Sequence, residues 1–163
     1  MTACSPKFDW RDYRSKDAPY AVLFPGKPAS QTRTIDLDGQ QVSMTMTAAE
    51  VDGVAFAVGS AELTDAAHAQ AALLAMKSAM INNIDGKIVS DTVAAASSGQ
   101  GTVSGQQTSI DVEAKGVQHG EPMLLIGHFV AKDKRIYQAV VVGREKKVLR
   151  EEVDTFISSF KLD

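Results

Sequence analysis

The chain has 163 residues, which is the size of one ordinary domain and is long enough to bury a core without disulfides or a structural metal. Hydrophobic residues make up 44% of it and charged residues 23%, a composition that excludes a disordered or fibrous protein. A net charge of -3 gives no overall attraction to nucleic acid, so we expect no nucleic-acid partner. No apolar run approaches the roughly 18–20 residues that a membrane-spanning helix needs.

The single cysteine, Cys4, lies in the opening stretch MTACSPK. Bacterial lipoproteins carry a signal peptide that ends in a box similar to Leu-Ala/Ser/Thr-Gly/Ala-Cys, and its cysteine becomes the lipidated first residue of the mature protein. Thr2-Ala3-Cys4 resembles the last three positions of that box, which implies lipid attachment at Cys4. The alternative is an ordinary free thiol near a frayed terminus. We expect a charged tether over residues 1–17 and a single domain over residues 18–163.

The sequence pattern predicts four short strands in the first half of the domain. An apolar strand over residues 20–24 stops at Pro25-Gly26-Lys27-Pro28, where two prolines and a glycine cannot continue a sheet. Asp38-Gly39 is a strong two-residue hairpin signal, and Asp52-Gly53 marks a second turn. The three strands around these turns are predicted over residues 32–37, 41–50 and 54–62.

The hydrophobic period changes from two to between three and four after Thr64, which predicts a helix to about Asn83 with a cap at Thr64 or Asp65. Four more strands are predicted over residues 87–95, 106–114, 122–131 and 135–143. A last helix over residues 147–160 places Phe156 and Phe160 on its apolar face, so we expect both rings in the core. The predicted order is therefore ββββαββββα. Because every link between strands is too short for a parallel crossover, the fold class is α+β, with an antiparallel sheet of about six to eight strands packed by helices.

A family resemblance rests on four features of this pattern. They are the segment Phe24-Pro25-Gly26-Lys27-Pro28, the aromatic pair Trp10 and Tyr13 upstream, the central amphipathic helix, and the ending Phe156-Ile157-Ser158-Ser159-Phe160. Together they resemble the PsbP-like group, which includes an extrinsic photosystem protein and many small bacterial envelope proteins. The resemblance spans roughly residues 9–162. It implies an α/β/α sandwich and a binding or assembly role, and it carries over no catalytic residue and no cofactor.

Polar residues that could support catalysis are scattered. His119, Glu121 and His128 could form a motif-less hydrolase or a metal-dependent site, but their spacing matches no metal-ligand pattern, so we expect no metal. Asp111 and Glu113 share the polar face of one strand, and two carboxylates in water stay ionised. The glycine-rich segment 97–105 connects two strands rather than a strand and a helix, which favours a hairpin tip over a phosphate loop.

Basic residues gather between Lys132 and Arg150, where seven of them face two acidic residues, a local balance of +5. The candidate anion-binding residues are Arg144, Lys146, Lys147 and Arg150, because they fall at the expected start of the last helix, where free backbone N–H groups also attract anions. The alternative is that Glu151 and Glu152 neutralise the patch and the lysines are merely solvated.

These observations favour a non-enzymatic bacterial envelope lipoprotein. We expect a domain that faces the periplasm and binds a protein or another envelope component, and we expect it to reach the membrane through the lipid on Cys4. Ser5, which follows the cysteine, permits sorting to the outer membrane by resemblance to enteric rules. The alternative function is the motif-less enzyme that would use His119, Glu121 and His128.

Overall fold

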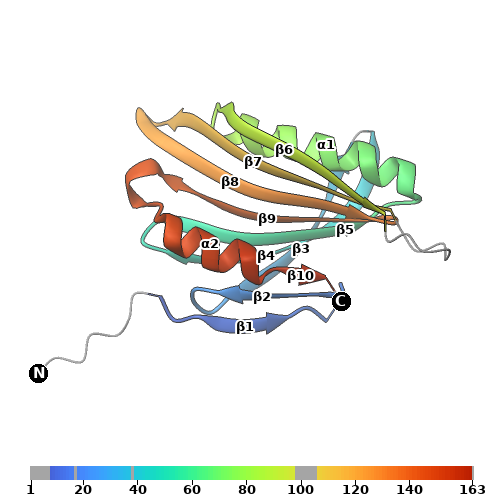
Figure 1. The fold of residues 1–163 in the computed structure, drawn as a ribbon, viewed down its shortest axis with the longest axis horizontal. Coiled ribbons are helices and arrows are strands. Elements are labelled where there is room, and N and C mark those ends of the chain that lie inside the picture. The colour runs from blue at the N-terminus through green and yellow to red at the C-terminus, as the bar shows by residue number, and fades with distance from the viewer. Residues whose placement is uncertain (1–7, 17, 38, 98–105, 163) are drawn as a thin grey trace, which may run out of the picture.

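The computed structural model describes residues 8–16, 18–37, 39–97 and 106–162, and within them it contains a three-layered fold. A seven-stranded antiparallel sheet forms the middle layer. Helix α1 (Ala66–Asn83) packs on one face, and helix α2 (Arg150–Ser159) packs on the other together with a three-stranded sheet (Figure 1). The predicted α+β class and the antiparallel sheet are confirmed. The PsbP-like resemblance stays a prediction.

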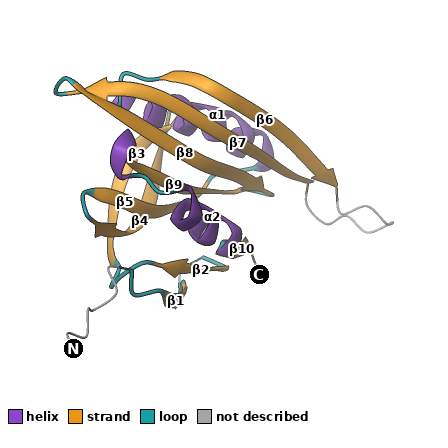
Figure 2. Cartoon of the chain, turned by 60° about the vertical axis from the view of Figure 1, so that its left-hand side comes forward, coloured by secondary structure: helices purple, strands orange, loops and turns teal. Residues whose placement is uncertain are grey.

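The predicted strand number and order are wrong. The described residues form ten strands, because one additional strand precedes the eight predicted strands and another follows them. The seven-stranded sheet has the order β3-β4-β5-β9-β8-β7-β6, so β3 and β6 are its edges (Figure 2). Its strands are β3 (Ala29–Leu37), β4 (Gln40–Val51), β5 (Val54–Glu62), β6 (Lys87–Ser97), β7 (Gln106–Gln118), β8 (Glu121–Lys132) and β9 (Arg135–Arg144).

The three-stranded sheet contains the two strands that the sequence pattern did not predict. Its order is β1 (Arg11–Arg14), β2 (Tyr20–Phe24) and β10 (Lys161–Leu162). We expected a tether over residues 1–17, but the folded domain begins earlier than residue 18. It includes Phe8, whose ring stacks on that of Trp10 with centroids 5.9 Å apart. The backbone N–H of Asp9 also donates to the carbonyl of Pro25 at 3.0 Å. β1 was not predicted because most of its residues are charged, so it shows no hydrophobic alternation.

Helix α1 begins and ends as predicted. Asp65 is its N-cap, and the Asp65 side chain accepts a hydrogen bond from the backbone N–H of His68 at 2.8 Å. This backbone N–H, and then the His68 ring, lower the pKa of Asp65 below its ordinary value. At the other end the N–H of Gly86 donates to the carbonyl of Ile81 at 2.9 Å. The helix lies close to the sheet because alanines form much of its buried face.

Helix α2 begins three residues later than predicted. Lys146 and Lys147 belong to a 3₁₀ turn, η1 (Glu145–Lys147), and Val148 and Leu149 are extended before the helix begins at Arg150. Its first turn therefore carries Glu151 and Glu152, the residue type that a helix N-terminus favours. The expected core positions of Phe156 and Phe160 are confirmed, since Phe156 is fully buried and Phe160 is 8% exposed.

Candidate functional site

The four candidate anion-binding residues lie around the η1 turn, and three of them are paired with carboxylates. Arg144 Nη1 lies 3.6 Å from Glu121 Oε2. Lys147 Nζ lies 3.5 Å from Asp52 Oδ2. The guanidinium of Arg150 donates two hydrogen bonds of 2.7 Å to the two carboxylate oxygens of Glu113. An anion at this corner would have to displace these carboxylates.

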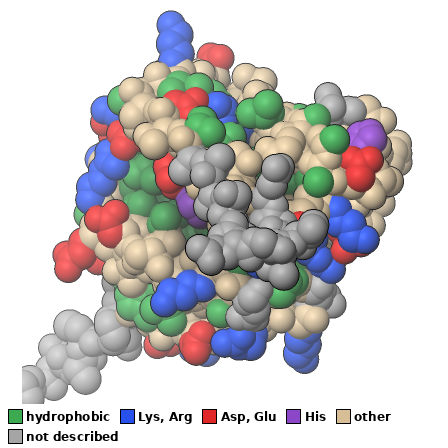
Figure 3. Space-filling model, turned by 45° about the vertical axis from the view of Figure 1, so that its right-hand side comes forward, with side chains coloured by type: hydrophobic (Ala, Val, Ile, Leu, Met, Phe, Trp, Pro, Cys, Tyr) green, Lys and Arg blue, Asp and Glu red, His purple; other side chains and the backbone are tan. Residues whose placement is uncertain are grey.

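The fourth residue, Lys146, lines a surface depression of about 370 Å³. The other lining residues are Glu121, Pro122, Arg144 and Glu145, so acidic and basic groups share the depression. The same mixture holds for the whole basic segment, because five of its seven cations meet carboxylates from outside residues 132–150. On the face that Figure 3 presents, basic and acidic side chains are likewise interspersed. The net charge of +5 counted along the sequence from Lys132 to Arg150 therefore does not produce a positively charged patch on the folded surface.

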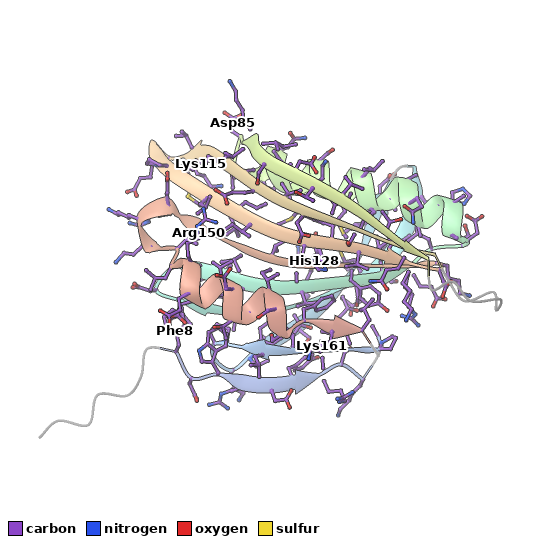
Figure 4. The ribbon with its side chains drawn as sticks, viewed as in Figure 1. Phe8, Asp85, Lys115, His128, Arg150 and Lys161 are labelled. Carbon is purple, nitrogen blue, oxygen red and sulfur yellow. The ribbon has the colours of Figure 1, made fainter. Side chains whose placement is uncertain are left out.

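Arg150 and Glu113 form a bidentate ion pair that joins α2 to β7. Figure 4 shows Arg150 at the start of α2, directed toward the large sheet. The hydrogen bonds from Arg150, followed by its charge, lower the pKa of Glu113, and the same bonds raise the pKa of Arg150. Glu113 is therefore an ionised acceptor at neutral pH and is not suited to act as a general acid.

The structure does not bring His119, Glu121 and His128 together. His119 occupies the turn between β7 and β8 in the left-handed region, with φ of 52°, and Glu121 is the first residue of β8. His128 follows Glu121 by seven positions, so it lies about 23 Å further along the strand and on the opposite face. In the described residues, no group of three or more His, Cys, Asp or Glu side chains could hold a metal ion.

His128 has a partner of its own. Its Nδ1 lies 2.7 Å from Oδ1 of Asp111, the residue directly opposite on β7. The ring also meets the ring of Phe160 edge-on, with centroids 6.2 Å apart. Asp111 and Glu113, the two carboxylates considered as an acid–base pair, are thus each bonded to a different basic side chain. Cys4 and most of the glycine-rich segment 97–105 lie outside the described residues.

An exposed apolar region along β6 was not predicted from the sequence. Five of the six large hydrophobic side chains that are exposed in the described residues lie on β6, on α1 beside it, or at the end of neighbouring β7; they are Leu74, Ile88, Val89, Val93 and Val117. Val93 is 64% exposed although it faces the same side as buried Ile110, its partner on β7. We call these five residues the β6 edge patch. The alternation of apolar and polar residues did not predict this patch, because a β-bulge interrupts that alternation between Ile88 and Ser90.

Leu74 belongs to this patch because α1 and β6 run in opposite directions. Lys77 Nζ lies 2.8 Å from Asp91 Oδ2, which fixes the two elements side by side. Leu74 stands one turn before Lys77, and Val93 stands two residues beyond Asp91, so the two apolar side chains lie on the same side of the ion pair. The patch therefore combines a sheet edge with an apolar helix flank.

Comparison with protein families found no family model that matches the chain, and comparison with curated proteins found no significant match. Neither described helix is both long enough and apolar enough to cross a membrane.

Proposed function

We propose that this protein is a bacterial envelope lipoprotein, anchored through Cys4, whose domain is a non-catalytic module that binds a protein partner along the β6 edge patch. The observation that carries the binding role is the concentration of exposed apolar side chains on one edge strand. Large exposed apolar groups are usually distributed singly on a soluble surface, whereas Ile88, Val89 and Val93 all lie on this one edge strand.

The chemistry of an edge strand defines the partner. β6 has a neighbour on one side alone in the described sheet, so the backbone groups of its outer side can pair with another strand. An extended segment of a partner protein can add to this edge through main-chain hydrogen bonds, while Val89, Val93 and Leu74 offer apolar contacts. The partner is therefore an extended peptide segment with apolar side chains.

The position of the first described residues supports a lipid anchor with this partner site. Three residues separate Cys4 from Phe8, so a lipid on Cys4 would hold the fold within about 14 Å of the anchor. Phe8 lies on the side of the small sheet, whereas β6 lies at the opposite edge of the fold (Figure 4). The β6 edge patch would then face away from the bilayer and toward the periplasm.

The anchor is tested with the full-length precursor expressed in a bacterium. We expect recovery in the membrane fraction, with mass spectrometry locating a diacyl modification on Cys4, and release of the Cys4→Ala variant from that fraction. Recovery of the wild-type protein in the cytosol without lipid would overturn the anchor and leave the β6 proposal to its own test.

The binding edge is tested by placing a photo-crosslinking amino acid at Val93 and, as a control, at Thr34 on the opposite edge strand β3. We expect one discrete cross-linked protein from Val93 and none from Thr34. The purified partner should then bind the Val89→Lys/Val93→Lys variant at least about tenfold more weakly, and the Thr34→Lys variant as well as wild type. Equal binding of the β6 variant, or a cross-link between two copies of this chain, would contradict the proposed partner site.

A further inference from the structure

We propose that a groove along β3 and β4, on the α1 side of the large sheet, binds a small carboxylate that carries an apolar chain. The groove has a volume of about 240 Å³, and its lining residues are Gln31, Arg33, Ile35, Met44 and Met46. It lies at the β3 edge of the sheet, whereas the β6 edge patch lies at the other edge. The site is therefore additional to the protein partner site proposed above.

The register between β3 and β4 gives this groove one apolar side and one polar side. Gln31 stands opposite Met46, and Arg33 stands opposite Met44. Ile35 lies on the same face of β3 as Arg33, because side chains two residues apart share a face. Met44 is 6% exposed and Met46 is half-buried, whereas Gln31 and Arg33 are exposed. Thioether and aliphatic groups therefore form the floor, and a guanidinium and an amide lie beside it.

The position of Met46 in this floor depends on a glycine in the next strand. Met46 stands opposite Gly59 on β5, and a Cβ on Gly59 would lie 2.6 Å from Met46 Sδ. Because the glycine has no side chain, Met46 lies across β5 and meets the buried amide of Gln138 on β9. Gln138 Nε2 donates to Met46 Sδ at 3.6 Å. The inner end of the groove is thus fixed by contacts from two further strands.

Arg33 gives the groove a positive charge that no carboxylate of the described residues neutralises. Its Nη2 donates to Gln31 Oε1 at 3.3 Å, and it forms no ion pair in the described part of the chain. Asp36, the acidic residue of the same strand, is engaged in the following turn, where its Oδ1 accepts a hydrogen bond from the N–H of Gly39 at 2.9 Å. An anion at Arg33 therefore displaces no carboxylate, in contrast to an anion at the η1 corner.

The lining selects the chemical class of the ligand. A guanidinium binds a carboxylate through two parallel hydrogen bonds, and the Gln31 amide carries further N–H donors. The floor of Ile35, Met44 and Met46 favours an apolar chain, and methionine adapts its shape to such chains. At about 30 Å³ for each non-hydrogen atom, the volume of the groove holds about eight such atoms. The expected ligand is therefore a monocarboxylate of about six to eight carbons.

The first experiment titrates octanoate into the full chain with ¹³C-labelled methionine methyl groups. We expect saturable shifts of the Met44 and Met46 resonances, with a dissociation constant of about 1 mM or below. The resonance of Met123, which lies on β8 beside the same core, should not move. The methyl resonances of Leu74 and Val93 should also stay, which distinguishes the groove from adsorption to an exposed apolar surface.

Related ligands separate the contribution of the charge from that of the chain. Octylammonium has the same chain with the opposite charge, so it should leave Met44 and Met46 unmoved because Arg33 repels it. Acetate lacks the chain and should bind at least about tenfold more weakly than octanoate, with butanoate and hexanoate between them. An arginine that only covers apolar surface with its stem would show no dependence on chain length.

Exposed charge variants locate the anion without disturbing the core. Arg33→Gln should weaken octanoate binding at least about tenfold, and Arg33→Lys, which keeps the charge without the planar fork, should fall between this variant and wild type. Lys87→Gln is the matched control, because it removes one positive charge from an exposed residue at the opposite edge of the sheet, and it should bind octanoate as wild type does.

Cooperative thermal unfolding establishes that each variant is folded, as expected for surface changes. Unmoved Met44 and Met46 resonances at about 10 mM octanoate would overturn the proposal. Equal shifts with octylammonium, or wild-type affinity in the folded Arg33→Gln variant, would also overturn it. None of these results bears on the β6 edge patch, which the cross-linking experiment tests separately.

Discussion

Replacement of Phe156 by alanine is expected to be among the most destabilising single changes in this fold. Its fully buried ring joins α2 to both sheets, because its centroid lies 5.5 Å from that of Phe56 on the large sheet and 5.6 Å from that of Phe24 on the small sheet. The lost transfer free energy is about 1.5–3 kcal/mol. A residual cavity of roughly 100 Å³ adds about 2.4 kcal/mol at 24 cal/mol per Å³, so we expect a loss of about 4–5 kcal/mol in the free energy of unfolding.

Equilibrium unfolding in urea measures this loss as a lower midpoint with an unchanged slope. Leu149→Ala is the matched control, since Leu149 directly precedes the same helix and is 50% exposed, and its effect should stay within about 0.5 kcal/mol. A loss below about 1 kcal/mol for Phe156→Ala would refute the reasoning, because it would mean that α2 does not hold the two sheets together through this ring.

The remaining predictions concern one ion pair and one close backbone approach. The folded-state pKa of Glu113 is lowered by Arg150, so the stability that the pair adds is fully present above the ordinary glutamate value of about 4.3 and is lost as pH falls through the folded-state value. Glu113→Gln should therefore cost about 1 kcal/mol at pH 7 and less at pH 2 in chemical unfolding, and an equal cost at both values would contradict the assignment. Gly116→Ala should cost about 1–3 kcal/mol, because its Cβ would overlap the carbonyl oxygen of Ile84, whereas Gly26→Ala, whose Cβ meets no atom within 4 Å, should change little; similar melting temperatures for the two variants would refute this.

Strands and helices with regular hydrophobic periods were predictable from the sequence. The strand β5 and the helix α1 are found at the predicted residues, because turn signals at Asp52-Gly53 and the cap at Asp65 mark their boundaries. The strands β1 and β10 were not predictable in this way. β1 is mostly polar and β10 has only two residues, and each forms only because it pairs with β2, a tertiary contact that a local pattern does not contain.

The candidate site was less predictable than the fold, since charge and exposure depend on which strands become neighbours. The residues around η1 formed a basic cluster in the sequence, and Glu121, Asp52 and Glu113 reach it from distant positions. The exposure of Val93 follows from the place of β6 at the sheet edge, which no local pattern specifies.

The two faces of β6 place a constraint on any segment that adds to it. Val93 and Asp91 face the α1 side, where Leu74 and the ion pair with Lys77 lie, whereas Ser90 and Thr92 stand opposite Glu113 and Asp111 on the polar side. A strand added beside β6 would have the same two faces, because side chains alternate along every strand of a sheet. The segment should therefore alternate apolar and polar residues. A register shift of one residue would place its apolar set on the polar face, beside Ser90 and Thr92 of β6, so this alternation would select both the partner and its alignment.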